Sequence, residues 1–188
     1  IENYSNYRTA RIELAKKLNK KDNYIWTNQY DNFENIKAHY QTTAPEIYKQ
    51  LNHKIDIVVV AMGTGGTICG LAKFFKQINQ DILICGVEPD GSTIFGGVEK
   101  SYLNVGIGLK GKDEILKNCK NSIDLHFKVS DKEAIKMVKK YQDIGFGIST
   151  GYALNIALKM SDKFPTKNIV VIAPDGMEKY EDILNEKI

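Results

Sequence analysis

Arginine, cysteine and long apolar runs are all scarce in this sequence of 188 residues. Its only arginines are Arg8 and Arg11, so no cluster of arginines dominates any segment. The formal net charge of +3 is too small and too evenly spread to predict binding to nucleic acid. No apolar run reaches the roughly 18 residues of a membrane span, and no signal peptide heads the sequence. We therefore expect a cytoplasmic protein that binds neither nucleic acid nor a membrane.

Cysteine and histidine are too few and too scattered to predict a disulfide framework or a metal site. The three cysteines, Cys69, Cys85 and Cys119, are odd in number and lack C-x-x-C spacing. No histidine has a cysteine or carboxylate at the spacing of a metal ligand set. We expect the cysteines to be reduced thiols, with Cys69 in a packing role rather than a redox role.

Strand-like and helix-like segments alternate along the chain. Residues 55–61, 82–87 and 168–173 are apolar runs typical of strands buried on both faces, and residues 125–129 predict a further strand. Helices are expected over residues 4–21, 67–77, 131–141 and 152–160. Two further helices are expected to start after Thr43, which would be the N-cap, and near Lys179. Residues 24–26 could form a strand, whereas residues 27–40 have no period and read as a loop. The alternation predicts an α/β fold, a doubly wound and mostly parallel sheet with helices on both faces.

A glycine-rich turn between a buried strand and a helix is the sharpest feature of the sequence. It comprises Gly63, Thr64, Gly65, Gly66 and Thr67. Glycines let the backbone approach an anion, and the free N–H groups and dipole of a helix start favour phosphate. The threonine hydroxyls add two donors. The alternative is that the glycines only let the strand and the helix pack closely.

Two common phosphate motifs fit this turn poorly. A P-loop requires a lysine after its last glycine, and Leu71 follows Gly70 here. The dinucleotide motif G-x-G-x-x-G is met at Gly63 and Gly65, but its third glycine is replaced by Ile68. Glu88, at the end of the next strand, stands near the position of a ribose-binding acid. A dinucleotide-binding domain therefore remains an alternative.

Several further motifs occur in series along the chain. The turn belongs to Val-Ala-Met-Gly-Thr-Gly-Gly-Thr-Ile-Cys-Gly at residues 60–70, and it is preceded by Asn-Gln-Tyr-Asp-Asn at 28–32 and Ala-His-Tyr at 38–40. The others are Thr-Thr-Ala-Pro-Glu-Ile at 42–47, Gly-Val-Glu-Pro-Asp-Gly-Ser at 86–92, Gly-Ile-Gly at 106–108, Gly-Ile-Ser-Thr-Gly at 147–151 and Pro-Asp at 174–175. In their order and approximate spacing these motifs, which cover nearly the whole chain, resemble the cysteine synthase and cystathionine β-synthase family. The members of that family are fold-type II pyridoxal phosphate (PLP) enzymes.

The resemblance implies that residues 63–67 hold the PLP phosphate, and that Ser149 and Thr150 either line the cofactor pocket or cap a helix. It implies β-replacement on serine or an activated serine with a thiol or sulfide, in a homodimer or beside a companion module of the same fold. It also implies that the catalytic lysine lies upstream of the matching segment, so that residues 1–188 form an incomplete PLP phosphate-binding α/β domain without the family's small domain. Lys54, Lys73, Lys110 and Lys112 are expected to be solvated surface charges.

Two positions depart from the pattern of the family. Val105 stands where a glutamate is usual before Gly-Ile-Gly, and Gly176 stands where a serine or threonine usually bonds the pyridine nitrogen. These changes keep open a second hypothesis, a catalytically degenerate module of the same fold that serves dimerisation, regulation or protein interaction.

Overall fold

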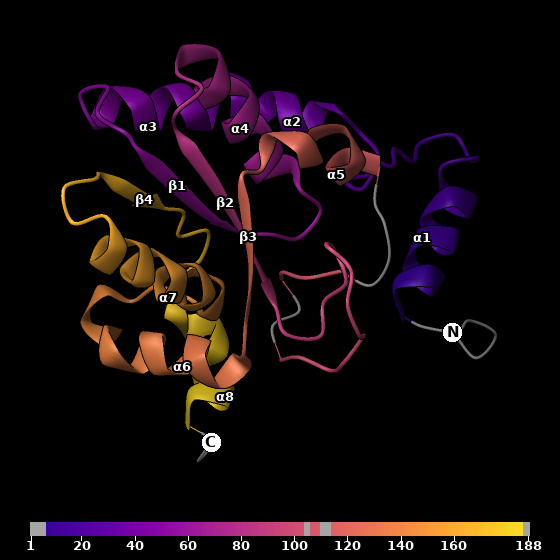
Figure 1. The fold of residues 1–188 in the computed structure, drawn as a ribbon. Coiled ribbons are helices and arrows are strands. Elements are labelled where there is room, and N and C mark those ends of the chain that lie inside the picture. Colours follow the sequence, from indigo (N-terminus) through magenta and orange to yellow (C-terminus); the bar gives the residue numbers. More distant parts are fainter. Residues whose placement is uncertain (1–6, 104–105, 110–113, 186–188) are drawn as a thin grey trace.

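Four parallel strands form a twisted sheet with helices on both faces, in a computed structural model that describes residues 7–103, 106–109 and 114–185 (Figure 1). The strands are β1 (Ile57–Ala61), β2 (Leu83–Pro89), β3 (Leu125–Val129) and β4 (Ile169–Val171), in the spatial order β3-β2-β1-β4. Ile57 of β1 pairs with Leu83 on one side and with Ile169 on the other. The expected fold class, a doubly wound α/β sheet, is confirmed.

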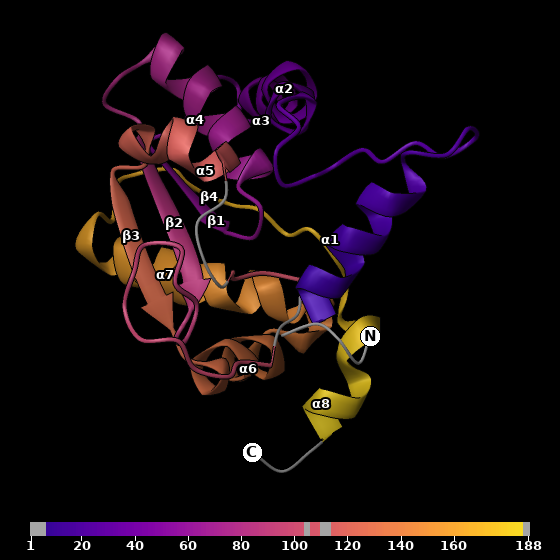
Figure 2. The ribbon, with the colours of Figure 1, turned by 90° about the vertical axis from the view of Figure 1, so that its right-hand side faces the viewer.

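The helices divide between the two faces of the sheet. One face carries α2 (Glu34–Ala38), α3 (Ala44–Gln50), α4 (Gly66–Ile78) and α5 (Glu114–Cys119), and the other carries α6 (Asp131–Lys140) and α7 (Ile148–Lys163) (Figure 1). The short α8 (Glu181–Asn185) follows a 3₁₀ turn, Met177–Tyr180, while α1 (Tyr7–Leu18) stands apart from the sheet (Figure 2). No described helix is both long and apolar enough to cross a membrane.

Alternate residues of the central strands supply two separate cores. Val58 and Val60 of β1 face the α3–α4 side, whereas Ile57 and Val59 face the α6–α7 side. Successive side chains of a strand point to opposite faces, so a strand with helices on both sides must be apolar at every position. That requirement explains the uninterrupted Ile-Val-Val-Val run of β1.

Several local expectations were wrong. Residues 24–26 form no strand, and Ile25 is almost fully exposed. Residues 27–40 contain α2, which runs without a break through a π-helical turn, His39–Thr43, into α3. Thr43 therefore lies inside a continuous helical segment and does not cap α3. The helix expected over residues 152–160 begins earlier, because α7 starts at Ile148 and takes in most of the Gly-Ile-Ser-Thr-Gly motif.

Cys69 and Cys119 form a disulfide that joins α4 to the end of α5, which corrects the expectation of three reduced thiols. Their Cα atoms lie 5.4 Å apart, inside the usual range for a disulfide. Fifty residues separate them in the sequence, so only the packing of α5 on α4 brings them together. Cys85 is free and buried, and burial raises the pKa of its thiol to about 12.

The chain reverses its direction across the sheet beside β1. From β1 it moves to β2 and then β3, and it returns through α6 and α7 to β4 on the opposite side of β1. In open α/β sheets ligands bind beyond the carboxyl ends of the strands at such a switch point. The turn that follows β1, residues 62–65, lies at this position.

Candidate phosphate-binding site

The turn after β1 delivers the chain into α4 with no side chain capping the helix. Gly65 is the N-cap residue, with a left-handed φ of 96°, and no side chain bonds the helix start. Non-glycine residues rarely adopt this conformation, so the turn requires glycine at position 65. The first N–H groups of a helix have no carbonyl partner inside the helix. An anion placed before α4 would satisfy these donors and interact favourably with the helix dipole.

The other glycines of the motif make room for neighbouring segments. A Cβ atom at Gly63 would lie 3.2 Å from the carbonyl oxygen of Gly106. The amide of Asn35, from α2, occupies the space that a Cβ atom at Gly66 would need. A Cβ atom at Gly70 would lie 2.6 Å from Cβ of His39. These three glycines therefore admit the segment at residues 106–107 and the helical segment at residues 34–50, rather than close packing between β1 and α4, and the helix start stays open.

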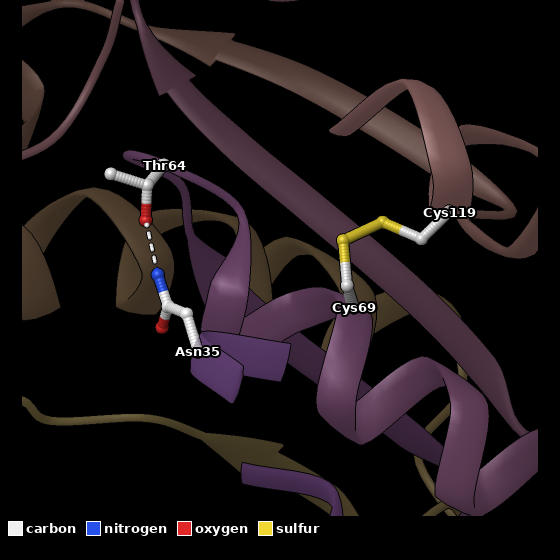
Figure 3. Close-up of a disulfide and its surroundings, with 4 residues drawn as sticks. All are labelled: Asn35, Thr64, Cys69 and Cys119. Atoms are coloured by element: carbon white, nitrogen blue, oxygen red, sulfur yellow. Dashed lines mark hydrogen bonds between the residues drawn. A yellow bond between two sulfur atoms is a disulfide. The ribbon is translucent and has the colours of Figure 1, made fainter. Parts of the chain in front are cut away.

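Both threonines of the turn bond to side chains of the continuous helical segment at residues 34–50, called the α2 segment below. Asn35 Nδ2 donates to Thr64 Oγ1 at 3.2 Å (Figure 3). Thr67 Oγ1 lies 3.2 Å from His39 Nε2, and His39 Nδ1 lies 3.0 Å from Thr43 Oγ1. Burial lowers the pKa of His39, so the neutral imidazole is favoured. Sequence reasoning missed Asn35 and His39 as parts of the site.

A cavity of about 330 Å³ opens in front of the turn. Its lining is formed by the turn and the start of α4, together with Gln29, Asn35, Gly106, Ile107 and Pro174. None of the described lining residues carries a charge, so an anion here would be held by N–H and O–H dipoles. This arrangement fits a phosphate group: a helix start without a cap, two hydroxyl donors and adequate space. The five predicted residues, Gly63, Thr64, Gly65, Gly66 and Thr67, all line this cavity.

Glu88 has a structural role that removes the main support for a dinucleotide site. Its side chain is fully buried and accepts the backbone N–H of Ile94 at 2.9 Å. Lys128 Nζ lies 3.6 Å from the same carboxylate. Glu88 does not line the cavity, so it is not placed to bind a ribose there.

The Gly-Ile-Ser-Thr-Gly motif at residues 147–151 is packed against neighbouring segments and does not line the cavity. Ser149 Oγ donates to Asp175 Oδ1 at 2.9 Å, and the hydroxyl of Tyr180 donates to Asp175 Oδ2 at 2.7 Å. Thr150 is buried, and its hydroxyl has no hydrogen-bond partner among the described residues. Neither Ser149 nor Thr150 lines the cavity, whereas Pro174 does. Ser149 therefore anchors α7 to the chain after β4 and is not among the lining residues.

The remaining candidates lie elsewhere or outside the described residues. Lys54 and Lys73 are exposed, as expected for surface charges. Val105, Lys110 and Lys112 fall outside the described residues. Within the described ranges no three His, Cys, Asp or Glu side chains are grouped as a metal site would require. Gly176 has the carboxylate of Glu178 in the space that a side chain at position 176 would fill.

Known proteins resemble this chain in sequence and in fold. The family model described as "Pyridoxal-phosphate dependent enzyme" matches residues 1–175. The chain is 37% identical to a cystathionine beta-synthase of Apis mellifera, over 91% of this chain and 36% of that protein. It is 38% identical to a cysteine synthase of Buchnera aphidicola subsp. Schizaphis graminum, over 84% of this chain and 52% of that protein.

Solved structures of similar fold also include enzymes named for cysteine or cystathionine synthesis. O-acetyl serine sulfhydrylase isoform 3 from Entamoeba histolytica superimposes with a TM-score of 0.84 and 33% identity, over 96% of this chain and 55% of that one. An O-acetylserine dependent cystathionine beta-synthase from Helicobacter pylori matches with a TM-score of 0.83 and 30% identity, over 96% of this chain and 59% of that one. The chain thus spans between about a third and three fifths of the length of these relatives.

Proposed function

Since this chain belongs to the family of pyridoxal-phosphate dependent enzymes, we propose that its uncapped turn after β1 holds the phosphate of PLP. The phosphate ligands would be Gly63, Thr64, Gly65, Gly66 and Thr67. The observation that carries the proposal is the open start of α4, which faces a cavity of about 330 Å³ with two threonine hydroxyls beside it. A phosphate dianion accepts hydrogen bonds only, and the described lining offers it donors without a charged side chain.

The reaction we propose is β-replacement on serine or an activated serine, with a thiol or sulfide as the incoming group. The names of the relatives, cystathionine beta-synthase and cysteine synthase, support this class of chemistry in sulfur amino-acid metabolism. When bound, PLP supplies an electron sink for charge that develops on the amino acid. The residues of this chain would bind and orient the cofactor: the N–H groups of α4 and the hydroxyls of Thr64 and Thr67 fix its phosphate, and Gln29 lines the space beyond. The Schiff-base lysine would come from sequence outside residues 1–188.

Three further statements belong to the same proposal. Residues 1–188 would form the PLP phosphate-binding domain of the enzyme, incomplete without the small domain. The protein would act on a small amino-acid substrate as a cytoplasmic homodimer. Family membership supports the amino-acid substrate.

Cofactor binding and lysine trapping test the proposal directly. The purified protein is incubated with PLP and reduced with borohydride, and the modified peptide is identified by mass spectrometry. We expect one pyridoxyl-lysine, outside residues 1–188. The double variant Thr64→Val/Thr67→Val should bind PLP more weakly than the wild-type protein does, and should bind pyridoxal, which lacks the phosphate, with unchanged affinity. A protein that binds both compounds equally well before and after the substitutions would contradict the proposal.

One observation favours a second candidate, a degenerate module that has kept the fold and lost the chemistry. Gly176 has no hydroxyl to offer a pyridine nitrogen, and the carboxylate of Glu178 occupies the adjacent space. For this candidate we expect a dimer by sedimentation that binds no PLP and forms no cysteine or cystathionine. PLP binding together with turnover of serine or O-acetylserine excludes it.

A further inference from the structure

We propose that Asn35 and His39 are positioning residues that direct the hydroxyl protons of Thr64 and Thr67 toward the bound phosphate. Each side chain would donate an N–H to a threonine oxygen, which leaves the threonine O–H free to donate to the anion. Both residues come from one continuous helical segment, residues 34–50, which packs beside the start of α4. This inference rests on the proposed binding of phosphate at residues 63–67.

The orientation of the Asn35 amide follows from its second hydrogen bond. Nδ2 lies 2.9 Å from the backbone oxygen of Gln29, which accepts hydrogen bonds and donates none. The nitrogen must therefore lie on this side, because the opposite orientation would place two acceptors against each other. The same nitrogen reaches Thr64 Oγ1 at 3.2 Å, and an amide nitrogen only donates. Thr64 therefore accepts from Asn35 and keeps its own proton for another partner (Figure 3).

His39 acts on Thr67 through the choice between its two neutral tautomers. The ring bridges two hydroxyls, since Nδ1 contacts Thr43 Oγ1 and Nε2 contacts Thr67 Oγ1. With the proton on Nδ1, Thr67 must donate to Nε2 and its proton is used. With the proton on Nε2, Thr43 donates to His39, His39 donates to Thr67, and the Thr67 proton remains free. A phosphate that accepts from Thr67 therefore selects the Nε2–H tautomer.

Two glycines, one at the start of α4 and one within it, leave room for these two side chains. The Asn35 amide fills the space where a Cβ atom at Gly66 would stand, and the absence of a side chain at Gly70 admits Cβ of His39 and the backbone nitrogen of Tyr40. The α2 segment is thereby close enough to α4 for both hydrogen bonds to form. The glycines of the motif thus let Asn35 and His39 reach the two threonine hydroxyls, and they also let the backbone approach an anion closely.

A double-mutant cycle tests the role of Asn35. Affinities for PLP and pyridoxal are measured for the wild-type protein, Asn35→Ala, Thr64→Val and the double variant. We expect Asn35→Ala to weaken PLP binding roughly tenfold, as for a hydrogen bond to a charged group, and to leave pyridoxal binding unchanged. In the Thr64→Val background, Asn35→Ala should have no further effect on PLP. Additive losses in the double variant would overturn the proposal.

Asn32→Ala is the matched control for damage to the segment. Asn32 bonds the backbone oxygen of Thr27 and the backbone N–H of Glu34, and not the turn. The Asn32→Ala variant should have a melting temperature at least as low as that of Asn35→Ala. Its ratio of PLP affinity to pyridoxal affinity should stay at the wild-type value. An equal loss of PLP affinity in both variants would show that Asn35 acts only through folding.

Nitrogen NMR of the imidazole tests the role of His39 by a signal that stability does not move. The chain has three histidines, so the His39 resonances are assigned by their loss in His39→Gln. On adding PLP we expect His39 to shift to the Nε2–H tautomer. His39→Gln, whose amide can still donate to Thr67, should retain more PLP affinity than His39→Phe. A tautomer unchanged by PLP, or equal affinities of the Gln and Phe variants, would overturn this part.

The outcomes separate this inference from the proposed function. If wild-type protein prefers PLP to pyridoxal but the cycle is additive and the tautomer fixed, the phosphate site stands and the positioning role fails. If wild-type protein shows no preference for the phosphorylated compound, the phosphate site itself fails, and this inference fails with it.

Discussion

Two glycine-rich segments lie at the starts of helices, at residues 63–67 and 147–151, and they have opposite environments. The first, residues 63–67, ends at the uncapped start of α4 and lines a cavity. The second, residues 147–151, comprises the N-cap and the first turn of α7, where Ser149 bonds Asp175 and the carbonyl oxygen of Ala134 occupies the space beside Gly151. Both have serine or threonine among the glycines. The difference shows that such a motif lines a cavity only where the neighbouring segments leave space beside it.

The first segment also lies on the face of the sheet that is cross-linked. Cys69 follows the turn closely in α4, and its disulfide to Cys119 fixes α5 over this helix (Figure 3). The α6–α7 face has no such link among the described residues and relies on close packing of the two helices. The following substitutions test this contrast.

The largest effect is expected on breaking the disulfide. Closing a loop of 50 residues stabilises a chain by about 4 kcal/mol in the entropy model, so reduction should lower the free energy of unfolding by up to that amount. Chemical denaturation with and without a thiol reductant measures it, with Cys69→Ala/Cys119→Ala as the variant that should no longer respond. Alkylation of denatured, unreduced protein should modify only Cys85, and modification of all three cysteines would show that the disulfide is absent.

Gly151→Ala should have the next largest effect on stability. The methyl group would collide with the carbonyl oxygen of Ala134 in α6, which cannot move without shifting that helix. Overpacking of this kind costs roughly 1–3 kcal/mol. Thermal unfolding should detect the loss, whereas the ratio of PLP to pyridoxal affinity should stay at its wild-type value. A change in that ratio would mean that the two segments are coupled.

Gly66→Ala should have the opposite pattern of effects, with a small loss of stability and a clear loss of PLP affinity. Here the obstacle is the end of the Asn35 side chain, which can turn aside, so we expect a stability change below about 1 kcal/mol. Displacing Asn35 should nonetheless weaken PLP binding by roughly tenfold. Isothermal titration against PLP, with a thermal melt as control, distinguishes the two effects. A large loss of stability with unchanged PLP affinity would contradict the view that residues 63–67 serve ligand binding whereas residues 147–151 serve packing.

The smallest effect concerns the capping box of α6, which contrasts with the uncapped start of α4. Ser130 Oγ accepts the N–H of Glu133, and the Glu133 carboxylate accepts the N–H of Ser130. Ser130→Ala should cost about 1 kcal/mol in the free energy of unfolding. The hydrogen bonds from Ser130 lower the pKa of Glu133 below its ordinary 4.5.

A lowered pKa in the folded state sets the direction of the pH dependence. The contribution of Glu133 is fully present above pH 4.5 and declines as the pH falls through its lower folded value. Glu133→Gln should flatten this part of the profile, since glutamine keeps the cap without ionising. Urea unfolding between pH 3 and pH 6, roughly the range where this carboxyl titrates, measures it. An unchanged profile would show that other carboxylates dominate.

The sequence alone determined the fold class and the first segment. The apolar run of β1, buried on both faces, predicts a parallel sheet, and the turn at residues 63–67 is evident because strand, glycines and helix follow one another within a few residues. The helix expected over residues 131–141 is confirmed as α6 for the same reason, since the residues of its capping box, Ser130 and Glu133, are neighbours in the chain.

Only the tertiary structure decided which neighbours those segments would meet. Cys69 and Cys119, Asn35 and Thr64, and Ser149 and Asp175 are distant in the sequence, and no local pattern predicts that they touch. The physical reason is that a pattern reports the conformation of its own backbone. Whether a hydroxyl or thiol is open to a ligand, bonded or cross-linked depends on which helix packs against it.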